Sequence, residues 1–283
     1  MERPADLPVF RHRDTHGCED RRVTATTHDF PHEILKDVAH RPWPTPAAPW
    51  VLTQTWRDLL FAHWPVDREM LRARVPAGLP LDLFDGQAWI GIVPFEMTNV
   101  APRATPALPW MSAFPELNVR TYVRVDDKPG VYFFSLDATN PIVVRTARVL
   151  FRLPYFVASM TVAREHGRIA YASRRTASDA AVFDAQYAPT GAPFTPERGS
   201  LEYFLTERYC LYTASPGGAL ARTDIHHPAW SLQQAEAEIG TNTMATAAGI
   251  RLPSTAPHLL FAKRQDAVAW LPASVTMRAR RMT

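Results

Sequence analysis

The clearest indication of architecture comes from ten residues near the middle of the chain, Phe114-Pro-Glu-Leu-Asn-Val-Arg-Thr-Tyr-Val123. Successive side chains of a β-strand point to opposite faces of the sheet. Asn118, Arg120 and Tyr122 therefore share one face, and Glu116 joins them if the strand begins before it. Two interpretations fit this alternation: an ordinary sheet with its polar face in solvent, or a barrel with a polar interior that holds a small ligand.

The rest of the chain predicts many strands and few helices. Asp67 and Asn140-Pro141 are typical helix starts, the second for a helix that ends near Arg152. Residues 187–200 are interpreted as a loop, 202–213 as a strand and 230–238 as a short helix. Asp126–Gly130 is interpreted as a five-residue hairpin loop. Further strands are expected at 81–84, 88–93, 119–125, 131–137, 156–163, 168–173, 259–262 and 267–271. This pattern favours a mainly β (α+β) domain, closed or half-closed.

Composition narrows the class of protein. The chain has 283 residues, 46% of them hydrophobic, and a formal net charge of +3 with scattered basic residues. We therefore expect no nucleic-acid partner. No run approaches the roughly 20 apolar residues of a membrane helix, so no membrane partner is expected either. With no apolar signal segment and two widely separated cysteines, Cys18 and Cys210, we expect a cytoplasmic protein with reduced thiols.

The two ends of the chain differ in character. Residues 1–45 are predicted to be a flexible polar tail with a Pro-rich connector, and residues 46–283 the globular domain. The tail holds five of the ten histidines, but their spacing matches no metal motif, so no metal is expected. His226 and His227 are interpreted as loop residues. No glycine-rich phosphate loop follows a strand, so no nucleotide cofactor is expected, and we predict no cofactor.

Several motifs carry a resemblance to a known family. Residues 50–272 resemble the bacterial DUF2071 or YqjF-like proteins, through Glu-Leu-Asn-x-Arg-x-Tyr at 116–122, Phe-Phe-Ser-Leu-Asp at 133–137 and Leu-Pro-Tyr-Phe at 153–156. Asp67–Leu79 is similar to the first helix of acetoacetate decarboxylases. The resemblance implies an acetoacetate decarboxylase-like antiparallel β-barrel with a few short helices. Because related barrels assemble, a homo-oligomer is a possible state.

The resemblance also implies site residues. It places the pocket glutamate on Glu116 and the pocket arginine on Arg57. Tyr155 and Phe156 stand where the decarboxylases carry two lysines, and a second pocket acid falls on Gly91. Tyrosine cannot form a Schiff base, and the three lysines present are Lys36 in the tail, Lys128 in a hairpin and Lys263 near the end. Imine-forming decarboxylation is therefore not expected.

We predict a cofactor-independent enzyme that performs proton transfer or lyase chemistry on a small carboxylic or oxo acid. Glu116 would move the proton and Tyr155 would stabilise developing charge. The predicted substrate-binding residues are Arg57, Asn118, Arg120, Tyr122 and Ser135, with the arginines holding an anion. Two alternatives stay open: a non-catalytic barrel that binds a small ligand, and a partner-binding protein that acts through its N-terminal tail.

Overall fold

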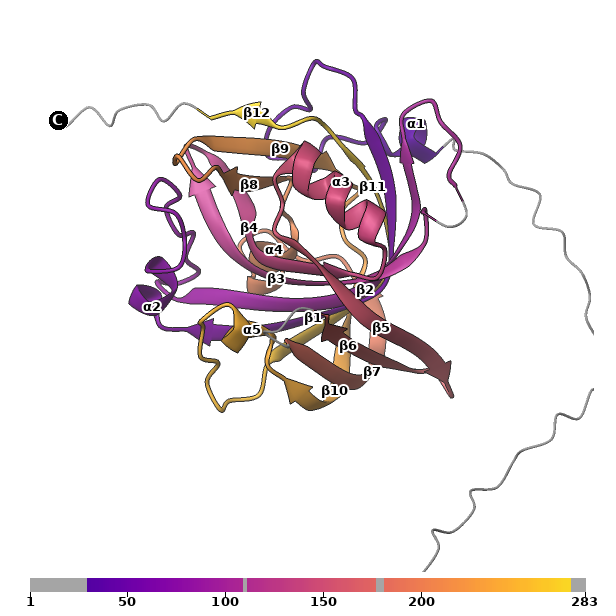
Figure 1. The fold of residues 1–283 in the computed structure, drawn as a ribbon, viewed down its shortest axis with the longest axis vertical. Helices are drawn as coiled ribbons and strands as arrows, with labels where there is room; N and C mark the ends of the chain where they lie inside the picture. The colour runs from indigo at the N-terminus through magenta and orange to yellow at the C-terminus, as the bar shows by residue number, and fades with distance from the viewer. Residues whose placement is uncertain (1–29, 109–110, 177–180, 276–283) are drawn as a thin grey trace, which may run out of the picture.

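A single sheet of twelve strands dominates the computed structural model, which describes residues 30–108, 111–176 and 181–275. The strand order is β12-β9-β8-β4-β3-β2-β1-β11-β10-β7-β6-β5 (Figure 1). The predicted mainly β architecture is confirmed. The strands are β1 (Leu52–Val66), β2 (Ala88–Pro102), β3 (Phe114–Val125), β4 (Lys128–Ala138), β5 (Tyr155–Glu165), β6 (Arg168–Arg175), β7 (Val182–Phe194), β8 (Cys210–Ala214), β9 (Leu220–His226), β10 (Leu232–Asn242), β11 (His258–Ala269) and β12 (Ala273–Ser274).

Two further pairings turn this sheet into two rings that share a wall. β9 pairs with β11, so that β9, β8, β4, β3, β2, β1 and β11 form a first ring. β4 pairs with β5, which closes a second ring through β6, β7 and β10. The shared strands β4, β3, β2, β1 and β11 therefore have one face toward each ring. The β2–β3 and β3–β4 pairings are antiparallel, as expected, and the β4–β5 and β4–β8 pairings are parallel.

Side chains fill the second ring. Leu117 and Val119 of β3 point into it and pack with Tyr171, Phe183 and Tyr187, which are almost completely buried. Large aromatic side chains bury about 150–250 Å² each, so this ring supplies much of the hydrophobic core. The residues of β3 that alternate with Leu117 and Val119 face the first ring instead. They include the polar residues Glu116, Asn118 and Arg120.

The two predicted helix starts are confirmed. Asp67 caps α2 (Arg68–Arg72), because its Oδ1 accepts a hydrogen bond from the Met70 amide at 2.7 Å. Asn140 caps α3 (Pro141–Phe151) in the same way, and Pro141 occupies the first turn. α3 lies across one side of the first ring (Figure 1). The remaining helices are α1 (Phe30–Ile34), α4 (Leu201–Thr206) and α5 (Met244–Ala247).

Three segments differ from their predicted structure. Residues 187–200 are mostly strand β7 rather than loop; beyond Tyr187 β7 no longer pairs with β6, so the missing amide of a proline is tolerated at this edge. Residues 202–213 divide into α4, capped by the Ser200 hydroxyl, and β8. Of residues 230–238, those from Leu232 onward belong to strand β10 instead of a helix, because β10 pairs with β7.

Two smaller corrections concern turns and strand length. The β3–β4 hairpin has a two-residue turn at Asp126-Asp127 instead of the expected five-residue loop, with a φ of 52° at Asp126. Lys128 consequently begins β4 and lies over the Trp43 ring at 5.7 Å. The expected strands at 259–262 and 267–271 are one continuous strand, β11, because it pairs with β1 from His258 to Ala269.

Residues 30–45 pack against the sheet, in contrast to the flexible connector expected there. Arg41 and Trp43 are buried. Trp43 donates its indole N–H to Asp224 at 3.1 Å, and Arg41 donates to the Ile225 carbonyl at 2.6 Å. The segment that contains Arg41 and Trp43 therefore covers the outer face of β9. The remainder of the predicted tail, residues 1–29, lies outside the described residues.

Candidate functional site

A cavity of about 150 Å³ lies inside the first ring. Most of its wall is apolar or aromatic, and Trp56 and Trp230 stack there with ring centroids 6.0 Å apart. The polar residues of the wall are Gln54, Glu116, Asn118, Arg120, Tyr155, Thr206, Arg208, Cys210, Thr223 and His227. An apolar enclosure with a few convergent polar groups is the usual form of a small-molecule site.

One strand supplies three of these polar groups. Glu116, Asn118 and Arg120 of β3 all line the cavity, as the alternation of their strand predicts. Glu116 and Asn118 are 2% and 4% exposed. A carboxyl, an amide and a guanidinium are thus held in a row on rigid sheet, in surroundings where polar interactions are strong.

Glu116 has an altered acidity because of this burial. Desolvation raises the pKa of its carboxyl to about 8, although the hydrogen bond from Tyr155 opposes that shift. The Tyr155 hydroxyl donates to Glu116 Oε2 at 2.7 Å. Burial and the neighbouring carboxyl together raise the pKa of Tyr155 well above its ordinary value. Near neutral pH, Glu116 is therefore mainly protonated and Tyr155 remains a hydrogen-bond donor.

Arg120 is a cation without a carboxylate partner among the described residues. Its Nη2 donates to the Leu205 carbonyl at 3.3 Å, its Nε is buried without a hydrogen-bond partner, and its guanidinium lies 5.3 Å from the Phe61 ring centre. Arg208, also in the wall, is neutralised by Asp82 at 2.6 Å. Arg120 is accordingly the guanidinium that is best placed to bind an anion.

Two further side chains of the wall are buried with an unsatisfied polar atom. Asn118 Oδ1 and Thr223 Oγ1 have no hydrogen-bond partner within the described protein. Leaving such a group unpaired costs about 1–3 kcal/mol. A ligand hydroxyl or N–H could satisfy the Asn118 oxygen, which is a second reason to regard this cavity as a binding site.

Three residues predicted to bind substrate lie away from the cavity. Arg57 follows Trp56 on β1 and therefore points to the opposite face, where its Nε contacts Thr98 at 3.3 Å. Ser135 pairs with Val119 across a β-bulge and faces the packed second ring. Tyr122 is completely buried and does not line the cavity.

Tyr122 instead supports the cavity wall. Its hydroxyl donates to the Leu205 carbonyl at 2.9 Å and lies 2.6 Å from His63 Nε2. Gly91 lies beside this pair, and a Cβ atom at Gly91 would be 2.6 Å from the same His63 nitrogen. The position where the decarboxylases carry a second pocket acid therefore has no room for a side chain unless His63 moves.

No lysine belongs to the described cavity wall. Lys263 is on the outer surface, where it pairs with Asp58 at 2.7 Å. Phe156, at the second lysine position, lies 3.8 Å from the Arg175 guanidinium, and Arg175 is paired with Asp137 in a buried bidentate contact. Within residues 30–108, 111–176 and 181–275 there is also no group of three or more potential metal-binding side chains.

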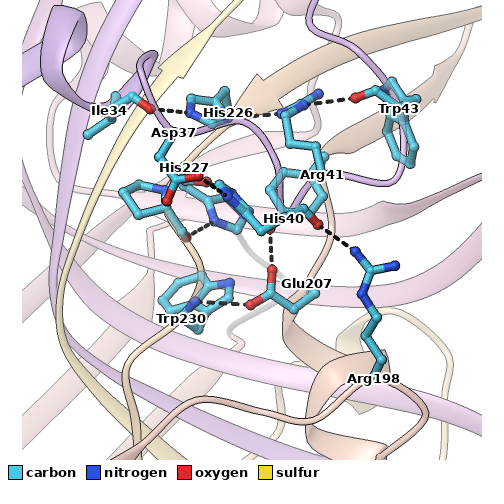
Figure 2. A network of polar contacts seen from close by, with 12 residues as sticks. Ile34, Asp37, His40, Arg41, Trp43, Arg198, Glu207, His226, His227 and Trp230 are labelled. Carbon is cyan, nitrogen blue, oxygen red and sulfur yellow. Dashed lines mark hydrogen bonds and ion pairs between the residues drawn. The ribbon is translucent and has the colours of Figure 1, made fainter.

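Sequence reasoning missed six polar wall residues: Gln54, Thr206, Arg208, Cys210, Thr223 and His227. His227 lies in the loop after β9, as expected, but it is buried, and burial lowers its pKa to about 4. Figure 2 shows how the N-terminal segment holds this region: His40 donates to the His227 carbonyl at 2.8 Å, and His226 donates to the Ile34 carbonyl at 2.7 Å. These contacts join positions 187 and 192 residues apart, so no local pattern in the sequence reveals them.

The comparisons with known proteins agree with this architecture. The profile of DUF2071, described as an uncharacterized conserved protein, matches residues 53–266. The chain belongs to the DUF2071 family. It is 52% identical over 221 residues to a Bacillus subtilis protein named "Uncharacterized protein YqjF", an alignment that covers 78% of this chain and 91% of the relative.

Solved structures of acetoacetate decarboxylase-like proteins share the fold. The acetoacetate decarboxylase of Legionella pneumophila superposes with a TM-score of 0.58 at 12% identity, covering 84% of this chain and 93% of that one. The enduracididine biosynthesis enzyme MppR, solved in complex with pyruvate, gives a TM-score of 0.57 at 12% identity and covers 83% and 93%. No helix in the described parts of the chain is long and apolar enough to cross a membrane.

Proposed function

We propose that this DUF2071 protein is a cofactor-independent enzyme that transfers a proton on a small carboxylic or oxo acid. The observation that carries the proposal is the Glu116 carboxyl, which is buried, opens onto an enclosed cavity and has a pKa raised to about 8. A group that titrates close to the working pH is an effective general acid or base, because both of its protonation states are populated.

Arg120 binds the substrate carboxylate. It has no acidic partner among the described residues, its surroundings are largely apolar, and its guanidinium can form two parallel hydrogen bonds to a carboxylate. The unpaired Asn118 Oδ1 accepts a hydrogen bond from a substrate hydroxyl and fixes its orientation. Both groups lie on the same face of β3 as Glu116.

The chemical step is then a proton transfer at the carbon next to the substrate carbonyl. The ionised fraction of Glu116, roughly a tenth at pH 7 for a pKa of about 8, removes the proton and becomes neutral. The electron pair of the broken C–H bond moves to the carbonyl oxygen, and Arg120 stabilises the resulting negative charge. Return of the proton to the same or a neighbouring atom regenerates the Glu116 carboxylate.

We assign Tyr155 a positioning role rather than direct contact with the developing charge. Its hydroxyl is engaged with Glu116 Oε2, so that it orients the carboxyl and favours the ionised form. The fold shared with enzymes such as MppR, which was solved with pyruvate bound, supports a small-molecule enzyme and leaves the reaction of this chain to experiment.

The alternative is a binding protein without turnover. It is favoured by the absence of lysine from the described cavity wall, because the imine chemistry of the decarboxylases has no nucleophile here. Arg120 and Asn118 would then bind the ligand, and Glu116 would remain a neutral hydrogen-bonding partner.

A two-part experiment tests the proposal. Thermal shifts with small oxo, hydroxy and unsaturated acids would be measured on wild type, Arg120→Gln and Arg57→Gln. A ligand at 100 times its dissociation constant adds about 2.7 kcal/mol of stability. We expect wild type and Arg57→Gln to respond and Arg120→Gln to lose the response, because Arg120 lines the cavity and Arg57 lies outside it.

The acids that bind are then followed by NMR in D₂O for replacement of the proton next to the carbonyl. Exchange that is lost in Glu116→Gln while the acid still binds supports the enzyme. Binding with no exchange and no chemical change in wild type supports the alternative. A response that persists in Arg120→Gln contradicts the site itself.

A further inference from the structure

A second cavity, of about 520 Å³, adjoins the first beside α3. The two cavities share five wall residues, all of them apolar: Leu52, Val100, Val143, Ala147 and Phe151. Three of these belong to the inner side of α3. A single layer of apolar side chains therefore separates the buried cavity from the second one.

Exposed apolar side chains gather at this place. Among the described residues, six large hydrophobic side chains are exposed, and Leu108, Leu150 and Leu271 line the second cavity. Ile142 and Val149 lie on the same helix, α3. Soluble monomers seldom expose contiguous apolar patches, and such patches mark places where an apolar partner or ligand binds.

Polarity also changes along the first cavity in the direction of the second. On β3 the order is Arg120, Asn118, Glu116 and then the apolar Phe114, which pairs with the part of β2 that leads to Val100 in the shared wall. Arg120 and Phe114 are six residues apart, so the polar and apolar ends are separated by about 20 Å of strand.

We infer that the ligand is an amphipathic acid whose carboxylate binds Arg120 and whose apolar chain passes α3 into the second cavity. This inference rests on the proposed function, since it extends the same site. A dry cavity of about 150 Å³ holds a molecule the size of benzene. A longer apolar chain consequently needs the additional space that the second cavity offers.

The apolar wall that the two cavities share is the reason to favour a ligand chain over a macromolecular partner. A second copy of this chain could cover Leu150 and Val149 equally well, because both are exposed on α3. A ligand chain in the second cavity would contact Leu150, which lines that cavity, but not Val149, which does not. These two neighbouring residues therefore form a matched pair for an experiment.

The test is isothermal titration calorimetry of butanoic, octanoic and hexadecanoic acids on the full chain, each below the concentration at which it self-associates. Burial of one methylene gives about 0.8 kcal/mol, so affinity rises roughly fourfold per buried methylene until the chain fills the space. Leu150→Glu lowers the affinity for hexadecanoate by at least about tenfold, because it places a charge beside the chain. Val149→Glu leaves the affinity for each acid of the series within about twofold of wild type. Leu150→Glu likewise leaves the affinity for butanoate within about twofold of wild type.

The outcomes separate this inference from the proposed function. Equal affinity along the series, with binding still lost in Arg120→Gln, overturns the amphipathic ligand and leaves the acid site intact. Equal effects of Leu150→Glu and Val149→Glu also overturn it, and a change in sedimentation in both variants would assign the face to a second copy of the chain. If no acid binds in a way that depends on Arg120, both proposals fail.

Discussion

Replacement of Glu116 by glutamine changes how the stability of the protein depends on pH. The pKa of this carboxyl is raised by burial to about 8 in the folded protein, against 4.5 for the unperturbed group. The native state therefore holds a proton over this interval that the unfolded state releases. The contribution of Glu116 to stability must fall as pH rises from about 4.5 to about 8, because the slope follows the difference in bound protons.

The size of the effect follows from the same two values. One unit of pKa corresponds to 1.36 kcal/mol, so the interval of about 3.5 units amounts to about 5 kcal/mol. Glutamine is neutral at every pH and its amide oxygen can still accept the hydrogen bond from Tyr155. We therefore expect Glu116→Gln to gain up to about 5 kcal/mol relative to wild type between pH 4.5 and pH 9.

Urea unfolding at several pH values measures this difference, because the contributions of all other titrating groups cancel between the two proteins. Glu165→Gln is a suitable control, since Glu165 is exposed on β5. A wild-type minus Glu116→Gln difference that stays constant across this pH range would refute the assignment of a buried, neutral carboxyl.

Three other predictions concern neighbouring buried groups. Tyr155→Phe raises the pKa of Glu116 above about 8 by roughly one to two units, since a hydrogen bond to a charged group contributes about 1.5–3 kcal/mol; the pH midpoint of the unfolding difference reports it. Asp137→Ala leaves Arg175 buried without its partner and costs about 3–5 kcal/mol in urea unfolding, and a loss below about 1 kcal/mol would contradict this. Burial raises the pKa of the Cys210 thiol to about 12, so in a Cys18→Ser background it should react with a disulfide reagent at pH 8 only after unfolding.

The part of the site that lies on one strand could be predicted from sequence. A strand places alternate residues on one face whatever else the chain does, and Glu116, Asn118 and Arg120 follow this rule. The sequence could not tell which face of β3 meets the cavity, because both faces are enclosed by rings. That outcome depends on the β9–β11 and β4–β5 pairings, which join distant parts of the chain.

Arg57 and Ser135 lie outside the cavity for reasons of local strand geometry. The resemblance to the decarboxylases implies Arg57 as the pocket arginine, but successive residues of β1 point to opposite faces, so Trp56 lines the cavity and Arg57 does not. Ser135 lies beyond a β-bulge in the β3–β4 pairing. A single extra residue moves the following side chains to the other face of the sheet.

The error in β10 came from a conflict between two signals. Its alanine, glutamate and glutamine residues favour a helix by intrinsic propensity. The alternation of Ala235, Ala237 and Ile239 with exposed Glu236 and Glu238 indicates a strand instead, and pairing with β7 decides in its favour. The helix α4 was missed although Ser200 is a regular capping residue, because the segment after it is rich in aromatic residues that also suit strands.

The most direct test of the central claim is a crystal structure of the protein with the best-binding acid from the screen. The account predicts that the carboxylate lies within about 3 Å of the Arg120 guanidinium, with the proton-bearing carbon next to the carbonyl facing Glu116 inside the first ring. An acid that binds outside this cavity, or inside it without contact to Arg120, would contradict the account.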